Sequence, residues 1–157
     1  MQKIDKSLTG SAGVHFVVAE LSRMGYIALP TVRNTKGIDV IITNPDFSKT
    51  IVIQVKTCQK PRKRPHWLLN EKADKIKSRN FFYVLVDIMK NNPDYYIVPS
   101  KIVADYVRTT HKMHVRKVKR NSGKKRTMRK IPNKYKSIDL EKYKKWEILR
   151  LDRFGKA

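Results

Sequence analysis

Cysteine is almost absent from this chain of 157 residues, which contains only Cys58. A single cysteine cannot form an internal disulfide, so a fold held together by disulfides is excluded. This composition suits a reducing compartment, and we expect a cytoplasmic protein. Cys58 itself is expected to pack as a small apolar side chain rather than to act as a nucleophile.

Long apolar runs are also absent. No run approaches the roughly 18 residues that a membrane-spanning helix needs. Residues 1–6 lack the apolar core of a signal peptide. We therefore expect no association with a membrane.

Acidic residues are scarce, since 13 Asp and Glu stand against 36 Lys and Arg, which gives a net charge of +23. Residues 111–157 hold 18 of the basic residues and four of the acidic ones, and no acidic residue occurs between Tyr106 and Ile138. A field of this sign favours polyanions. Nucleic acid is the expected partner, because the basic run has no apolar helical face that would suit a membrane surface.

The rest of the composition is that of one folded domain. Apolar residues make up 40% of the chain, which is enough for a single core at this length. The patterns predict an α/β fold with a mixed central β-sheet flanked by helices. Helices are expected at 13–25, 70–76, from 100 past 107, and 138–146, and strands at 27–30, 37–42, 51–56, 81–88 and 95–98.

Three parts of the chain are distinguished by composition. We expect a folded core over residues 1–110 and a basic arm over 111–136. The remaining residues, 137–157, are expected to form a helix, capped by Ser137, that packs back on the core. Trp67 and at least one member of the pair Tyr95 and Tyr96 are expected in the core.

The centre of the predicted core is a β-hairpin. Two apolar, β-rich segments, residues 37–42 and 51–56, flank the turn-forming residues 44–48. Side chains alternate along a strand, so Gln54 and Lys56 share one face.

The register of this hairpin decides where Asp39 lies. If the hairpin turns between Asp46 and Phe47, Asp39 lies opposite Gln54, whereas a register shifted by two residues places it opposite Lys56. In either register an acid, an amide and a lysine gather on one patch of the sheet. Such a patch suits a divalent cation and a phosphate.

Asp39, fourteen intervening residues and then Gln54-x-Lys56 resemble the core motif of the PD-(D/E)XK nuclease superfamily. The Gln-x-Lys form is similar to that of Mrr-like restriction nucleases and of relatives of the Holliday-junction resolvases. The resemblance covers about residues 8–110 and implies a restriction-endonuclease-like fold. Its further parts are the preceding helix and Gly-aromatic exit at 10–26, and later strand-like segments at 67–69, 81–87 and 95–100.

The resemblance implies a catalytic set of Asp39, Gln54 and Lys56. Asp39, the Gln54 side chain and the backbone carbonyl of Val55 would hold Mg²⁺ or Mn²⁺, since hard cations prefer oxygen ligands. Lys56 would orient the attacking water and stabilise charge on the phosphoryl oxygens.

Two positions depart from the family pattern. Ile38 stands where the superfamily often has proline, and His15 stands where its opening helix often carries glutamate. His15 and Glu20 are therefore the accessory candidates, because a histidine can also ligate a metal or act as a base.

Contacts to the nucleic-acid backbone are expected from basic residues outside this motif. The candidates are Arg62, Lys63, Arg64, Arg116, Lys117, Lys119, Arg120, Lys124, Lys125, Arg126, Arg129 and Lys130. Such contacts set affinity without reading sequence.

The function that we expect is that of a metal-dependent DNA endonuclease, associated with the nucleoid when bound to DNA. The alternative is a catalytically weak or inactive DNA-binding protein of the same fold, because Gln54 and His15 each replace a usual carboxylate. A third reading, from charge alone, is an RNA-binding structural protein. Cutting both strands with one small domain would favour a homodimer.

Overall fold

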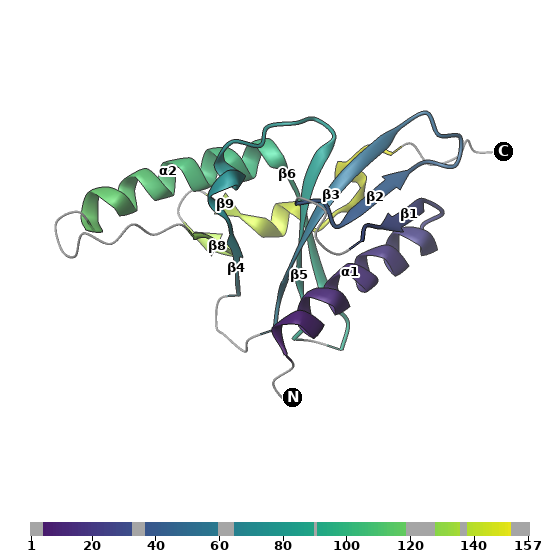
Figure 1. The fold of residues 1–157 in the computed structure, drawn as a ribbon, viewed down its shortest axis with the longest axis horizontal. Coiled ribbons are helices and arrows are strands. Elements are labelled where there is room, and N and C mark those ends of the chain that lie inside the picture. The colour runs from purple at the N-terminus through teal and green to yellow at the C-terminus, as the bar shows by residue number, and fades with distance from the viewer. Residues whose placement is uncertain are drawn as a thin grey trace.

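The computed structural model describes residues 5–32, 37–59, 65–89, 91–118, 128–135 and 138–151. For residues 111–118 and 135 it describes the backbone alone. A five-stranded sheet forms the centre of the molecule (Figure 1). Its strands run in the order β1-β2-β3-β5-β6, with β3 and β5 parallel and the other neighbours antiparallel. Their bounds are Ile27–Pro30 (β1), Val40–Thr43 (β2), Thr50–Cys58 (β3), Phe81–Asp87 (β5) and Asp94–Pro99 (β6). The mixed α/β fold expected from the sequence is confirmed.

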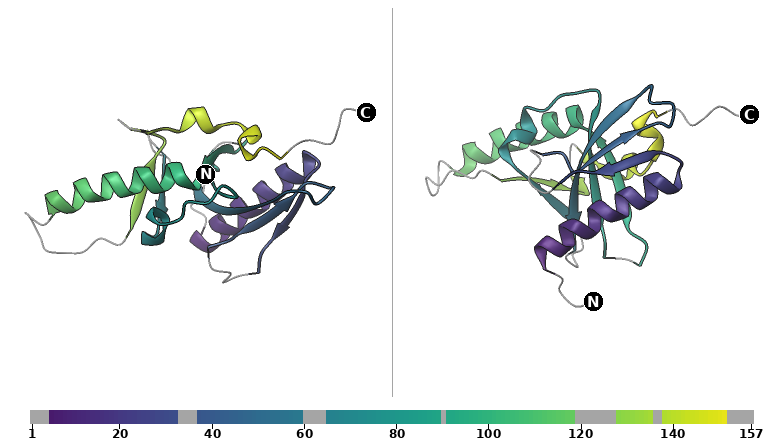
Figure 2. Two further views of the ribbon diagram at one scale, coloured as in Figure 1. Left: turned by 90° about the horizontal axis from the view of Figure 1, so that it is seen from above. Right: turned by 45° about the vertical axis from the view of Figure 1, so that its right-hand side comes forward.

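Helices cover the two faces of this sheet. Helix α1 (Lys6–Arg23) is capped by Asp5, whose side chain accepts a hydrogen bond from the Ser7 amide. The helix buries Val17 and Leu21 against one face. Helix α2 (Ser100–Val118) packs on the other face and extends away from the sheet (Figures 1 and 2). Neither helix of the described part has a stretch apolar enough to cross a bilayer.

The side chains of strand β5 alternate between two hydrophobic cores, one on each face of the sheet. Val84 and Val86 join the α1 side, while Tyr83 and Leu85 join the α2 side. Every second side chain of a strand points to the same face, so a strand that is apolar throughout is buried on both faces.

A small second sheet packs on the α2 side. Strand β4 (His66–Leu69) pairs antiparallel with β7 (Arg129–Pro132), and the short 3₁₀ helix η1 (Glu71–Asp74) follows β4 with Asn70 as its cap. Trp67 and Ile131 are buried there, and the Trp67 ring nitrogen donates to the Val86 carbonyl at 2.9 Å. The expectation that Trp67 belongs to the core is confirmed, as it is for Tyr96 and Cys58.

Both ends of the segment 111–136, predicted as a basic arm, belong to regular elements of the fold. Helix α2 continues through Val118, and β7 lies within the predicted arm. The reason is alternation, since Arg129 and Ile131 point inward while Lys130 is exposed. Residues 119–127 lie outside the described part of the chain.

The predicted C-terminal helix over 138–146 is also wrong, although its packing on the core is confirmed. The segment forms β9 (Ile138–Asp139), which pairs with β8 (Lys134–Tyr135), and then two 3₁₀ helices, η2 (Leu140–Tyr143) and η3 (Trp146–Leu149). Leu140 joins the α2-side core and Leu149 the α1-side core. One straight helix could not reach both faces of the sheet, whereas two short turns can. The predicted cap, Ser137, lies outside the described residues.

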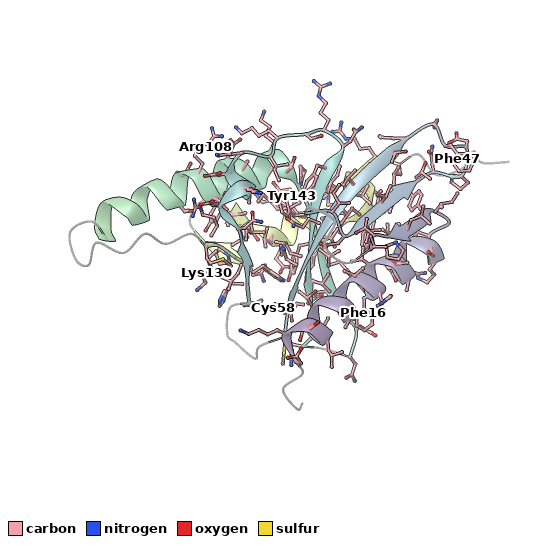
Figure 3. All side chains as sticks on the ribbon, viewed as in Figure 1. Phe16, Phe47, Cys58, Arg108, Lys130 and Tyr143 are labelled. Carbon is pink, nitrogen blue, oxygen red and sulfur yellow. The ribbon has the colours of Figure 1, made fainter. Side chains whose placement is uncertain are left out.

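Phe47, at the tip of the β2–β3 hairpin, adopts left-handed backbone geometry with φ of 58°. Its amide donates to the Asn44 carbonyl at 2.9 Å, and its ring is 72% exposed. Figure 3 shows it at the far end of the molecule from Lys130. A residue with a Cβ pays about 1–2 kcal/mol for this conformation.

Phe47→Gly should therefore raise the free energy of unfolding by about 0.5–1 kcal/mol, because the relieved strain exceeds the added entropy of the unfolded chain. Denaturant unfolding of both proteins measures the difference. Phe47→Ala is the control, because it removes the ring but keeps the strained Cβ and should give no such gain.

Lys144 fastens the C-terminal segment to β6. Its Nζ lies 3.2 Å from Asp94 Oδ1 and 3.1 Å from Glu141 Oε2. Burial opposes a low pKa for Glu141, but hydrogen bonds from Asn133 and Lys144 outweigh burial and hold that pKa below 4.5. Folded Glu141 thus binds its proton less tightly than the unfolded chain does. The contribution of Glu141 to stability is therefore present above the pKa that it has in the unfolded chain. That contribution is lost as the pH falls through the pKa that Glu141 has in the folded protein.

Lys144→Met should lower the free energy of unfolding by about 0.5–1 kcal/mol near neutral pH, as is usual for partly exposed ion pairs. The deficit should shrink in acid as Glu141 becomes protonated. Urea unfolding across this pH range measures it. The exposed neighbour provides the matched control, since Lys142→Met should show no pH-dependent deficit, and an equal deficit in both variants would refute the ion-pair account.

Candidate functional site

The site forms where β2 begins beside β3. Val40 pairs with Ile53, and one further step of this register brings Asp39 opposite Gln54. The first of the two registers considered from the sequence is therefore confirmed. Strand β3 continues to Cys58, so its last residues have β5 on one side and no β2 strand on the other.

Beyond the start of β2, Asp39 provides the hydrogen bonds that a neighbouring strand would make to β3. Its Oδ2 accepts a hydrogen bond from the Val55 amide at 2.7 Å, and its own amide donates to the Ile53 carbonyl at 2.8 Å. The N–H and C=O of one strand residue point to the same side. The Val55 carbonyl therefore faces the same open edge as the Asp39 carboxylate.

Gln54 and Lys56 project from the same face of β3. Their register partners on β5 are Tyr83 and Leu85, both of which belong to the α2-side core. Gln54 is only 7% exposed and Lys56 is half-buried. Within the described part of the chain, neither side chain has a hydrogen-bond or ion-pair partner.

Gln54 and Lys56 are thus polar side chains on a largely apolar strand, and no other described side chain holds them. Here the Asp39 carboxylate, with one oxygen on the Val55 amide, and the Val55 carbonyl lie at the open edge of β3, and the Gln54 and Lys56 side chains rise from the adjoining face of the same strand. The donor set is all oxygen and carries one negative charge from Asp39, which fits Mg²⁺ or Mn²⁺ bound with several waters.

The accessory candidates on α1 do not share this face. α1 packs on the face that carries Val55, opposite to the Gln54 and Lys56 side chains. His15 is exposed, and Glu20 pairs with Arg23 at 2.6 Å, which lowers the pKa of the Glu20 carboxyl. Among the described residues, no three His, Cys, Asp or Glu side chains gather into a metal-binding group. The proposed accessory roles of His15 and Glu20 stay predictions.

The basic candidates divide into three groups. Arg129 is only 8% exposed, and its Nη2 lies 3.8 Å from Asp74 Oδ2, so its side chain faces the protein, which argues against its expected role in nucleic-acid binding. Lys130 is exposed on the outer side of β7, as that role requires. Arg116 and Lys117 lie on α2. The other candidates, Arg62, Lys63, Arg64, Lys119, Arg120, Lys124, Lys125 and Arg126, lie outside the described residues.

Tyr83 is a polar neighbour of the site that sequence reasoning missed. Its side chain is fully buried, its hydroxyl has no hydrogen-bond partner among the described residues, and burial raises its pKa to about 12. The residues around Tyr83 on β5 are apolar up to Val86 and contain no signal for it. Only the pairing of β3 with β5 places Tyr83 beside Gln54.

Helix α1 sets the position of the end of β3. A Cβ at Gly13 would overlap the Thr57 hydroxyl, and Thr57 directly follows Lys56. Thr9 also contacts the Gln59 side chain just beyond the strand. The close approach of helix and strand therefore requires glycine at position 13.

Gly13→Ala should lower the free energy of unfolding by about 1–3 kcal/mol, because the added methyl group forces the helix off the strand. Gly10 is the matched control on the same helix, since nothing lies within 4 Å of its Cβ direction. Gly10→Ala should stabilise by up to about 1 kcal/mol through helix propensity. Denaturant unfolding of both variants tests the pair, and equal effects would contradict the close contact.

Comparison with protein-family models finds no match, and comparison with curated proteins finds none either. Among solved structures, the chain is similar to a bacterial homing endonuclease, at 15% identity and a TM-score of 0.49, over 66% of this chain and 74% of that one. It is also similar to Hjc, a Holliday junction resolvase from Archaeoglobus fulgidus, at 14% identity and a TM-score of 0.46, over 78% of this chain and 82% of that one. Likeness at this level carries no argument about activity or ligand.

Proposed function

We propose that this chain is a metal-dependent endonuclease that hydrolyses phosphodiester bonds in DNA. The observation that carries the proposal is the position of Asp39 just before β2, opposite Gln54, with its carboxylate bonded to the amide of Val55, which stands between Gln54 and Lys56 on β3. Their sequence pattern resembles the core motif of the PD-(D/E)XK superfamily, and oxygen donors directly precede on β3 a lysine that has no acidic partner in the described part of the chain.

Each residue has a defined task in this proposal. Asp39 and the Val55 carbonyl would hold the ion from the open edge, and Gln54 would add its carbonyl oxygen from the face. The bound ion supplies Lewis acidity and neutralises charge on the scissile phosphate. Lys56, which no carboxylate of the described chain neutralises, would orient the attacking water and stabilise the developing negative charge.

The charge of the chain supports a nucleic-acid ligand. A net charge of +23 attracts a polyanion at long range, and exposed lysines such as Lys130 supply backbone contacts. The expectations of a homodimer and of a cytoplasmic, nucleoid-associated location stay predictions.

A DNA-binding protein without cleavage activity is the second candidate. It is favoured by the neutral amide of Gln54 where the superfamily usually has a carboxylate, because one negative charge fewer weakens binding of the ion. The two candidates differ in their dependence on metal, since a binder is indifferent to chelation.

We expect the protein to nick or linearise supercoiled plasmid with Mg²⁺ or Mn²⁺ and not with EDTA. Lys56→Ala should reduce the rate by about 10²-fold or more, as loss of a group that stabilises transition-state charge does. Asp39→Asn, which keeps an acceptor for the Val55 amide, should also abolish cleavage. Gel electrophoresis of the plasmid and mobility shifts in low salt measure activity and affinity separately.

Lys101→Ala is the control of equal charge, because Lys101 is exposed at the start of α2, away from the hairpin. It should cleave like the unmodified protein. Full cleavage by Lys56→Ala would refute the site. An EDTA-insensitive mobility shift without cleavage in any metal would favour the second candidate.

A further inference from the structure

The small sheet formed by β4 and β7, here called the ribbon, has two unlike faces. Trp67 and Ile131 are register partners that point inward and are 1% and 0% exposed. Leu68 and Lys130 are the next partners along the ribbon, and both point outward, with Leu68 51% exposed. Met128, two residues before Lys130, is 54% exposed. Leu68, Met128 and Lys130 together define the outer face of the ribbon.

The outer face combines two large apolar side chains with a cation. One exposed leucine needs no explanation, since folded proteins leave many apolar atoms in water. Leu68 and Met128 beside Lys130, however, form a surface that suits a ligand with apolar and anionic groups close together. The groove of a nucleic-acid duplex is such a ligand, because its base edges lie between two rows of phosphates.

The sequence places positive charge at both ends of the ribbon. β4 follows residues 60–64, of which four are Lys or Arg, and Met128 follows residues 119–127, of which five are Lys or Arg and none is acidic. Because β4 and β7 are antiparallel, the two basic segments join the ribbon at opposite ends. An apolar centre with a basic segment at each end complements a groove that has phosphates on both sides.

The ribbon packs on the same face of the main sheet as the proposed site. Its buried residues Trp67 and Ile131 join the α2-side core, which also contains the β5 register partners of Gln54 and Lys56. A ligand held by the ribbon is therefore on the side of the sheet from which Gln54 and Lys56 project, and not on the α1 side. The proposed nuclease requires its DNA on that side.

The outer face carries no aromatic ring, which favours duplex over single-stranded DNA. Proteins that bind single strands stack successive bases on aromatic side chains. Trp67, the aromatic residue of the ribbon, faces inward, and the exposed phenylalanines Phe16 and Phe47 lie on α1 and at the hairpin tip. A two-stranded ribbon, in contrast, fits the major groove of B-form DNA, which is about 12 Å wide.

We propose that the outer face of the ribbon enters the major groove of duplex DNA, with Leu68 and Met128 against base edges and Lys130 on a phosphate. Apolar side chains in this groove contact thymine methyl groups. The inference deepens the proposed function, because it names B-form duplex DNA as the substrate class. It rests on DNA as the ligand of that function and is independent of cleavage.

The experiment measures binding by fluorescence anisotropy in EDTA, with the full chain and three labelled probes of one sequence and length: duplex DNA, single-stranded DNA and duplex RNA. Duplex RNA has a similar charge, but its major groove is too deep and narrow for side chains to read. We expect the unmodified protein to bind duplex DNA most tightly.

Two substitutions test the apolar contacts. Leu68→Ala and Met128→Ala should each weaken binding to duplex DNA by about fivefold, because the contact of an apolar side chain with the bases is lost. Neither should change affinity for duplex RNA by more than about twofold, since the RNA is held through its phosphates. Lys130→Ala should lower the log–log salt slope for duplex DNA by about 0.9, the value of one phosphate contact.

Leu29→Ala is the matched control, because Leu29 is 56% exposed and lies on β1, outside the ribbon. It should leave affinity for all three probes unchanged. Thermal unfolding verifies the fold of each variant. All the replaced side chains are exposed, so each variant should melt at the same temperature as the unmodified protein.

Three outcomes would overturn the inference and leave the metal site of the proposed nuclease intact. They are unchanged affinity for duplex DNA in both Leu68→Ala and Met128→Ala, an equal loss on duplex RNA, and tighter binding of single-stranded than of duplex DNA. Failure of the unmodified protein to bind any probe would remove DNA as the ligand, and with it both proposals. The expected binding pattern without plasmid cleavage in any metal would support the ribbon contact and refute the nuclease.

Discussion

The hydrogen bond from the Val55 amide to the Asp39 carboxylate is the interaction on which the proposed site depends. β2 is only four residues long, so β3 outlasts it and leaves backbone groups at an open edge. Asp39 satisfies one of these groups with its side chain and thereby fixes its own carboxylate beside the Val55 carbonyl. Because β2 begins only at Val40, the edge of β3 beyond Ile53 stays open, and the hydrogen bond from the Val55 amide fixes the Asp39 carboxylate at that edge.

The features of this site that sequence could predict are those set by local geometry. Alternation along one strand places Gln54 and Lys56 on one face whatever the fold. The hairpin turn then limits Asp39 to a few registers, and the turn between Asp46 and Phe47 selects the pairing with Gln54. Both arguments use residues close in sequence, for which the chain itself supplies the geometry.

The features that sequence could not predict depend on pairings between distant segments. Tyr83 becomes a neighbour of Gln54 only because β5 pairs with β3 in one register. Arg129 looks like its basic neighbours, yet pairing of β7 with β4 turns it inward toward Asp74. The C-terminal segment has helical composition, but its apolar residues serve opposite faces of the sheet. In each case tertiary packing overrides a valid local preference.

In the proposed nuclease, the weak set of oxygen donors and the high positive charge of the chain compensate for each other. One carboxylate, one amide and one carbonyl give an ion less attraction than two carboxylates would. Mg²⁺ sites in phosphoryl chemistry commonly complete their coordination with phosphates of the substrate. A chain of net charge +23 concentrates those phosphates at its surface. In the proposed nuclease, ion binding and DNA binding should therefore reinforce each other, and by linkage each increases the affinity for the other equally. In that proposal, a neutral glutamine at position 54 would restrict full occupancy of the site to the DNA-bound state.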